Sequence, residues 1–243
     1  MSLSGKRALV TGASGVLGAA IARRLARDGA SLLLHGNSRP DAVEELAQQI
    51  RAEGGEAEPC VFDLTDAEAT RSACDAMLMA GPVQIIVNNA GVHDDAVFPG
   101  LRAEQWHRVI DVSLHGFFHV TQPLLLPMLR TRWGRVINLS SVAALMGNRG
   151  QVNYAAAKGA LNSATKALAL EVASRGVTVN AIAPGIIESK MANAAFDAAA
   201  IAQLVPCKRA GTPEEVAALA GFLASEEAAY ITGQVISING GMA

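Results

Sequence analysis

Short apolar runs alternate with longer segments of helical periodicity along the chain. The runs are RALVTG, SLLLHG, EPCVFD, VQIIVNNAG, GRVINLSS, VTVNAIAPG and QVISINGG, and about 20 to 40 residues separate one from the next, as in chains built of βαβ units. They are apolar throughout rather than at every second position, which is typical of strands buried on both faces of a parallel sheet. The pattern therefore predicts an α/β fold, a doubly wound seven-stranded parallel sheet with helices on both faces.

Helical periodicity predicts helices over residues 16–28, 41–53, 66–79, 102–130, 152–174 and 213–225. Thr212 followed by Pro213 gives the last of these a cap and a first-turn proline. No linker, repeat or low-complexity block interrupts the series, so we expect one domain over residues 1–243. The segment 188–210 has weaker periodicity, and we expect it to form a mobile lid over the substrate.

Composition narrows the classes of partner and the compartment. There are 20 Lys and Arg residues against 22 Asp and Glu residues, so no strong field favours nucleic acid or an anionic membrane. The three cysteines are widely spaced, which favours a reducing compartment and no metal site. The chain starts directly with a strand pattern, and no apolar run approaches the ~18 residues of a spanning helix. We expect a soluble cytoplasmic protein.

Three glycines follow the first apolar run: Gly12, Gly15 and Gly18 stand in TGASGVLG at the mouth of a helix. Glycine lets the backbone approach a diphosphate, and the N–H groups and dipole of a helix start favour its charge. Any tight strand-to-helix turn uses glycine, so the glycines alone leave two interpretations open. Their place in the first βαβ unit is the one that a Rossmann-type dinucleotide site requires.

The end of the second apolar run indicates which dinucleotide is bound. An NAD site usually has a carboxylate here for the ribose 2′-hydroxyl, and LLLHGNSRPD has none before Asp41. Basic and polar side chains could instead receive a 2′-phosphate; they are His35, Asn37, Ser38 and Arg39. We therefore predict NADP(H), with an ordinary polar turn as the alternative.

Two further runs end in polar residues. Asp63, in VFDLTD, could hold the adenine amino group or cap the helix expected at residue 66. The sequence NNAG, residues 88–91, ends the fourth run at the expected topological switch point, where a ligand crevice opens. Its asparagines could equally lock neighbouring loops.

Tyr154 and Lys158 are the two large ionisable residues in NYAAAKGA, four positions apart on one helix face. A nearby ammonium favours a phenolate, so we expect Lys158 to lower the pKa of Tyr154 from about 10. Ser141, in NLSSV, could hold a carbonyl oxygen beside the tyrosine or simply cap a loop. A Tyr–Lys pair alone also occurs on solvated helices.

The motifs together carry a resemblance over essentially the whole chain. The chain resembles the short-chain dehydrogenases/reductases in the order and spacing of its motifs, which are TGASGVLG, NNAG, Ser141, YAAAK, NAIAPG and ITGQVISINGG. Through MGNRGQVNYAAAKGAL and EVASRGVTVNAIAPGIIESKM it is most similar to the 3-oxoacyl-[acyl-carrier-protein] reductases. It is also similar to reductases encoded with aryl polyene pigment pathways.

The resemblance implies that a nicotinamide gives a hydride to a ketone while Tyr154 gives a proton to the developing alkoxide. Ser141 would orient the carbonyl, and Lys158 would bind the nicotinamide ribose. The cofactor contacts predicted from residues and resemblance together are Gly12, Ser14, Gly15, Val16, Leu17, Gly18, Asn37, Arg39, Asp63, Leu64, Asn89, Ala90, Gly91, Tyr154, Lys158, Pro184, Gly185, Ile187 and Ser189.

The chain departs from the family pattern at three positions. Val16 replaces the middle glycine of the loop, and a β-branched residue does not readily take positive φ, so either that site is helical or the diphosphate lies differently. Gly15 replaces the basic residue of many NADP-dependent members. Ser113 stands where the family has an asparagine that holds a water in a proton relay, so Ser113 is predicted to complete the catalytic set with a shifted relay.

Arg132 and Arg175 match a basic rim for the acidic acyl carrier protein in the similar reductases, although they could be solvated helix-end arginines. The resemblance also implies a homotetramer formed by the helices 102–130 and 152–174 and by the last strand. The leading hypothesis is an NADPH-dependent reductase of 3-oxoacyl thioesters. The alternatives are a reductase or alcohol dehydrogenase for free small substrates, and a low-activity nucleotide-binding subunit of a hetero-oligomer.

Overall fold

A computed structural model describes residues 2–189 and 197–243, and it confirms the predicted seven-stranded parallel sheet. The strands are β1 (Arg7–Val10), β2 (Ser31–Gly36), β3 (Glu56–Val61), β4 (Ile85–Asn88), β5 (Gly134–Leu139), β6 (Val177–Pro184) and β7 (Val235–Ile238). Their order is β3-β2-β1-β4-β5-β6-β7, and each pair is parallel. The order reverses between β1 and β4, which places a ligand crevice outside the carboxyl ends of these two strands.

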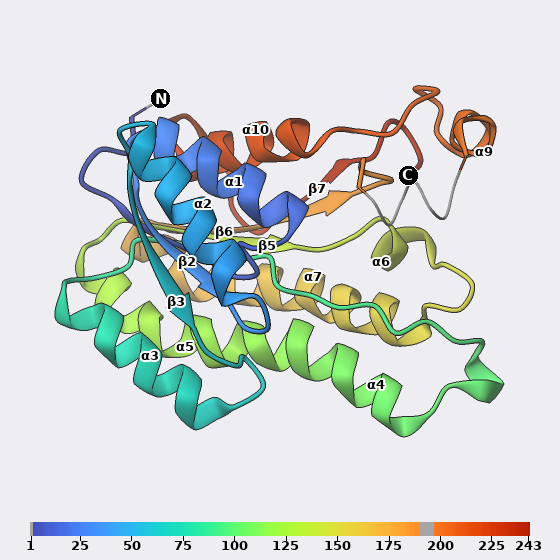
Figure 1. The fold of residues 1–243 in the computed structure, drawn as a ribbon, viewed down its shortest axis with the longest axis horizontal. Helices are drawn as coiled ribbons and strands as arrows, with labels where there is room; N and C mark the ends of the chain where they lie inside the picture. Colours follow the sequence, from blue (N-terminus) through green and yellow to red (C-terminus); the bar gives the residue numbers. More distant parts are fainter. Residues whose placement is uncertain (1, 190–196) are drawn as a thin grey trace.

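Helices cover both faces of the sheet (Figure 1). One face carries α1 (Val16–Arg27), α2 (Pro40–Ala52) and α10 (Pro213–Ala224), and the other carries α3 (Ala67–Met79), α4 (Ala103–Ile110), α5 (Gly116–Arg130) and α7 (Val152–Val172). Each layer has its own apolar core: Ile21 and Leu25 of α1 pack in the first core, and Leu124 and Met128 of α5 in the second. The doubly wound arrangement is therefore also confirmed.

The helix predicted over 102–130 is present from residue 103 to residue 130, but it is not α-helical throughout. Between α4 and α5 the backbone makes a π-helical turn at Asp111–His115, and this turn carries Ser113. A π turn adds a residue to the helical register, and such turns are frequent at functional sites. The apolar pattern continues through the segment because both halves are apolar, so periodicity alone does not reveal the π turn.

The predicted lid over 188–210 is described in part, since residues 190–196 lie outside the described residues. Its second half contains a short helix, α9 (Ala198–Leu204), whose start is capped by the Asp197 side chain. Val205 and Ala210, which follow this helix in the chain, are buried. A second short helix that the pattern did not predict, α6 (Ala143–Met146), follows β5. No helix in the described part of the chain is long and apolar enough to cross a membrane.

Candidate active site

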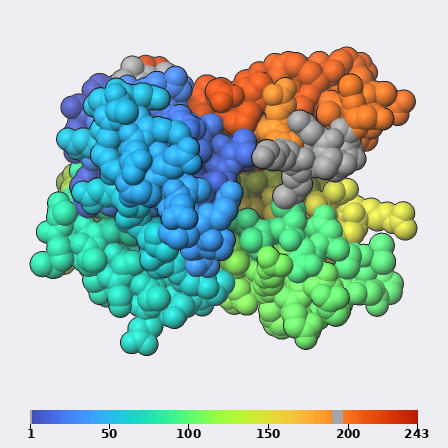
Figure 2. All heavy atoms as spheres, viewed as in Figure 1, coloured from blue at the N-terminus to red at the C-terminus, as the bar shows by residue number. Residues whose placement is uncertain are grey.

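The predicted reacting residues meet at the carboxyl edge of the sheet. Ser141 lies just beyond the end of β5, and Tyr154 and Lys158 lie in the first half of α7. In Figure 2 the green, yellow and orange parts of the chain gather on the right of the molecule, the side on which Figure 1 shows α6 and the start of α7. Segments far apart in the sequence therefore form this edge.

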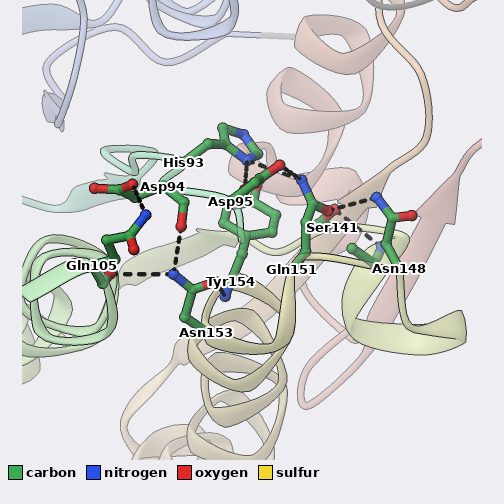
Figure 3. Close-up of polar contacts among 10 residues, drawn as sticks. His93, Asp94, Asp95, Gln105, Ser141, Asn148, Gln151, Asn153 and Tyr154 are labelled. Carbon is green, nitrogen blue, oxygen red and sulfur yellow. Dashed lines mark hydrogen bonds and ion pairs between the residues drawn. The ribbon is translucent and has the colours of Figure 1, made fainter. Parts of the chain in front are cut away.

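Tyr154, Ser141 and Lys158 form one polar cluster, and Figure 3 shows Tyr154 and Ser141. The Tyr154 phenol and the Ser141 hydroxyl are hydrogen-bonded, and Ser141 Oγ also accepts from the Ala143 amide at 3.1 Å. Lys158 is buried, its Nζ donates to the Leu139 carbonyl at 2.7 Å, and this Nζ lies 5.7 Å from the Tyr154 ring centroid. The three residues are thus close enough to act on one carbonyl group.

The prediction that the Tyr154 pKa is lowered is wrong for this structure. Burial raises the pKa of Tyr154 to about 12, and the hydrogen bond from Ser141 offsets this only in part, while the Asp95 carboxylate raises it further. Burial also lowers the pKa of Lys158 to about 8. Removing charged forms from water is unfavourable, and for both groups that effect is the largest cause of the pKa shift.

Ser113 lies beside this cluster and is buried without a hydrogen-bond partner for its Oγ among the described residues. A Cβ added at Gly91 would lie 3.1 Å from Lys158 Nζ and 3.5 Å from Ser113 Oγ. The space that glycine leaves at position 91 is therefore bordered by both polar groups. A buried hydroxyl without a partner is unfavourable and calls for a functional explanation.

The glycine loop after β1 closes tightly on the loop after β4. Gly12 has φ +64°, and a Cβ at Gly18 would collide with the Gly12 carbonyl and lie 2.7 Å from Asn89 Nδ2. Gly15 caps α1, and Val16 begins the helix without positive φ. The replacement of the middle glycine by Val16 therefore needs no strained backbone, because the site is helical.

A groove of about 490 Å³ runs from this loop along the ends of β2 and β3. Its lining includes Asn37, Arg39 and Asp63. Arg39 Nη2 donates to the Ser14 carbonyl at 2.7 Å, so the guanidinium reaches across to the glycine loop. Asp63 accepts from Thr65 and Asn37, which lowers its pKa, and the cap of α3 is Asp66 instead.

His35 cannot receive a phosphate as predicted. The ring is buried, Nδ1 accepts from the Gly12 amide at 3.1 Å, and Nε2 donates to the Phe62 carbonyl at 3.0 Å. Burial lowers the pKa of His35. Both ring nitrogens are used to join the glycine loop to the end of β3, and the ring is neutral. The residues that remain as candidates to bind a 2′-phosphate are therefore those after β2 that line the groove.

The asparagines of NNAG lock neighbouring elements. Asn89 Nδ2 donates to the Thr11 carbonyl at 2.8 Å and to the Gly12 carbonyl at 3.1 Å. Asn88 Nδ2 donates to Thr121 of α5 and to Asn138 of β5. The loop-locking alternative thus describes Asn89, whereas Asn88 joins β4 to a helix and a strand, and Ala90 and Gly91 line the groove.

The remaining predicted cofactor contacts lie near the same edge. Pro184 ends β6, and Gly185 packs so closely that a Cβ there would be 2.8 Å from Asn239 Cα. Ile187 pairs with Gly211 as an isolated bridge, and Ser189 follows it in the chain. Leu17, in the first turn of α1, packs against the core, and Leu64, which is buried, also lines the groove.

The loop directly after NNAG, which carries His93, Asp94 and Asp95, is part of the site and was not predicted from the sequence. Asp94 accepts from Gln105 Nε2 at 2.6 Å, and Asn153 Nδ2 donates to the Asp94 carbonyl at 2.9 Å (Figure 3). These bonds fasten the loop to α4 and α7 beside Tyr154. The signal available in the sequence was the run of titratable residues at the switch point.

The two arginines of the predicted carrier rim lie at the opposite edge of the sheet. Arg132 follows α5, and Arg175 lies in a 3₁₀ turn after α7, both directly before a strand. A strand such as β5, Gly134–Leu139, is roughly 17 Å long at about 3.3 Å per residue. Within one chain the rim is therefore separated from Ser141 by the length of the sheet. No group of His, Cys, Asp or Glu in the described residues could hold a metal ion.

Comparisons with known proteins identify the family. Residues 12–243 match the family model described as enoyl-(acyl carrier protein) reductase. The 3-oxoacyl-[acyl-carrier-protein] reductase FabG of Aggregatibacter actinomycetemcomitans is 42% identical to this chain, and the alignment covers 96% of this chain and 98% of the relative. The FabG of Pseudomonas aeruginosa is also 42% identical, over 100% of this chain and 99% of its own. A solved structure of a putative gluconate dehydrogenase from Agrobacterium tumefaciens is 34% identical, with a TM-score of 0.95 over 99% of this chain and 97% of that chain. The chain belongs to the short-chain dehydrogenase/reductase family of oxidoreductases.

Proposed function

We propose that this protein reduces the 3-oxo group of an acyl carrier protein-bound thioester with NADPH, giving the 3-hydroxyacyl thioester. The observation that carries the proposal is the cluster of Ser141, Tyr154 and buried Lys158 at the switch-point edge of the sheet. Two relatives that are 42% identical over nearly the whole chain bear the name of this activity.

The residues present fit a nicotinamide dinucleotide. The close approach at Gly18 and the positive φ of Gly12 shape a backbone cradle at the start of α1, where a diphosphate is favoured. Arg39 at the groove lip supports NADP(H) over NAD(H), and the absence of a carboxylate at the end of β2 agrees. When bound, the cofactor supplies the hydride.

Tyr154 would donate the proton that the ketone oxygen needs as it becomes an alkoxide. A phenol whose pKa is about 12 stays protonated near neutral pH, which suits a proton donor in the reducing direction. Ser141 would hold the carbonyl oxygen beside that phenol. Lys158 would stabilise the phenolate left behind, since its ammonium persists at pH 7.

The carrier protein would meet this site only in an assembly of several copies. Arg132 and Arg175 are too far along the sheet to serve Ser141 of their own chain, so a basic rim there would guide a carrier to a neighbouring copy. An apolar groove of about 340 Å³ between α5 and α7 supports such an assembly, with Phe118 on its lining. Leu170, also on α7, is 86% exposed. A homotetramer is the assembly that we propose.

A second candidate function is reduction or oxidation of small free substrates. It is favoured by the distance between the arginine rim and the reacting residues, and by the likeness to a putative gluconate dehydrogenase. A carrier-independent enzyme would have no need of the rim.

The experiment follows the absorbance of NADPH, and separately of NADH, with two substrates that carry the same 3-oxoacyl group. One is the thioester of the carrier protein, and the other is the thioester of a short free thiol. We expect rapid loss of NADPH with the carrier-bound substrate. Tyr154→Phe should lower kcat by about a hundredfold or more, as expected for a lost general acid, while Tyr230→Phe, on the exposed surface, should not change it. Equal rates with both presentations would favour the second candidate, and no loss with either cofactor would overturn both.

A further inference from the structure

His93 is held flat against the Tyr154 ring. The two ring centroids are 4.1 Å apart and the planes are inclined by 29° (Figure 3). The loop that carries His93 is fastened on both sides, because Asp94 bonds to Gln105 of α4 and the Ala96 amide donates to the Gly150 carbonyl at 2.9 Å. The imidazole therefore has a fixed place beside the phenol.

The neighbours of His93 also fix where its proton lies. Gln151 Nε2 donates to Asp95 Oδ2 at 2.7 Å, and Gln151 Oε1 accepts from Asn148 at 2.9 Å, so the orientation of this amide is determined. The same Nε2 faces His93 Nδ1 at 3.4 Å, which makes Nδ1 an acceptor. Asp95 Oδ1 is 3.9 Å from Nδ1, too far for a hydrogen bond. In the neutral ring, the proton is consequently on Nε2.

The ring is neutral near pH 7. Burial lowers the pKa of His93, and the Lys158 ammonium lowers it too, while Asp95 acts in the opposite direction. Nε2–H meets no polar partner among the described residues, and 36% of the side chain is exposed beside Tyr154. Nε2–H is thus a fixed donor that has no partner among these residues and lies next to the reacting phenol. Such a donor can bind a second acceptor oxygen of the substrate.

We infer that His93 is a specificity-determining residue that donates its Nε2–H to the thioester carbonyl of the substrate. The inference rests on the proposed function. In a 3-oxoacyl thioester one methylene separates the two carbonyl groups. When Tyr154 and Ser141 hold the 3-oxo oxygen, the thioester oxygen therefore lies within a few ångströms of it. His93 thus selects compounds with two neighbouring carbonyls over simple ketones.

The test compares two substrates on the same preparations, a 3-oxoacyl thioester and a ketone of equal length without the thioester. His93→Phe keeps an aromatic ring against Tyr154 and removes the donor, whereas His93→Gln keeps an N–H donor. His107→Phe, on the exposed face of α4, is the matched control. The ratio of the two kcat/KM values does not depend on the fraction of folded enzyme, so a partly folded variant still gives an answer.

We expect His93→Phe to lower kcat/KM for the thioester about tenfold, or about 1.4 kcal/mol, mainly through KM, and to change the simple ketone less than twofold. His93→Gln should stay within threefold of wild type on both substrates. An equal loss on both substrates in His93→Phe, or no loss on either, would overturn the inference. A wild-type enzyme that reduces the simple ketone but not the thioester would instead overturn the proposed function, and one that reduces neither would overturn both.

Discussion

Replacing Lys158 by methionine should stabilise the fold and inactivate the protein. Lys158 is buried, and burial lowers its pKa from 10.5 to about 8. At about 1.4 kcal/mol per pH unit, this difference corresponds to roughly 3 kcal/mol lost from the free energy of unfolding at pH 7. Methionine has a similar length and no charge, but it gives up the bond to the Leu139 carbonyl, worth about 1 to 2 kcal/mol. The net gain should be about 1 to 2 kcal/mol.

The pH dependence separates this cause from a packing effect. Lys158 releases its proton at lower pH when folded than when unfolded, so between pH 8 and 10.5 the unfolded chain binds more protons. Wild-type stability from this group therefore rises with pH in that window. The advantage of Lys158→Met should be complete at pH 7 and shrink by about 1.4 kcal/mol per pH unit above pH 8.

Urea unfolding followed by circular dichroism at pH 7 and pH 9.5 measures both quantities, with NADPH oxidation as the activity assay. Lys166→Met, an exposed position on the same helix, is the matched control and should change stability by less than about 0.5 kcal/mol. The reasoning is refuted if Lys158→Met is no more stable than wild type at pH 7, or if its advantage is the same at both pH values.

Three further outcomes are expected. Arg39→Leu should raise KM for NADPH about tenfold and leave KM for NADH within twofold, as for a lost phosphate contact; steady-state kinetics with equal effects on both would contradict the assignment. Ser113→Ala should leave the free energy of unfolding unchanged or raise it by up to about 1 to 3 kcal/mol, because it removes a buried hydroxyl that has no partner in the described structure, yet lower kcat; an unchanged kcat would remove Ser113 from the reaction. Subunits with both Arg132→Glu and Arg175→Glu should recover activity on carrier-bound substrate in mixed oligomers with Tyr154→Phe subunits, because each subunit supplies the part that the other lacks. A rate that mixing does not raise would count against a rim that serves a neighbouring copy.

Local chemistry made the elements predictable. The buried runs needed only their continuous apolar character to be placed as strands, and the start of α10 followed from Thr212 and Pro213. The structure adds that Glu215 returns the cap, donating from its amide to Thr212 Oγ1 at 3.3 Å and accepting from the Thr212 amide at 2.8 Å. Such signals lie within a few residues of each other, so they are present in the sequence.

The parts that failed depend on contacts between distant residues. His35 stood beside polar neighbours in the sequence, but its two ring nitrogens are taken by Gly12 and Phe62, which are 23 and 27 positions away. The sign of the Tyr154 shift depended on burial, which a four-residue spacing does not report. The role of His93 required Gln151, 58 positions later in the chain.

Several unfavourable features of this fold lie at the carboxyl edge of the sheet. In the part of the chain that the structure describes, the buried side-chain atoms without partners are Ser113 Oγ and Asn162 Oδ1, and Asn162 lies one turn of α7 beyond Lys158. Lys158 itself is a buried cation, and the Tyr154 phenol is held away from water. Replacing any of these groups with an apolar residue of similar size would be neutral or favourable for folding alone. The closeness of Ser113, Tyr154 and Lys158 at this edge is therefore explained by chemistry carried out there, since stability gives no reason to keep them.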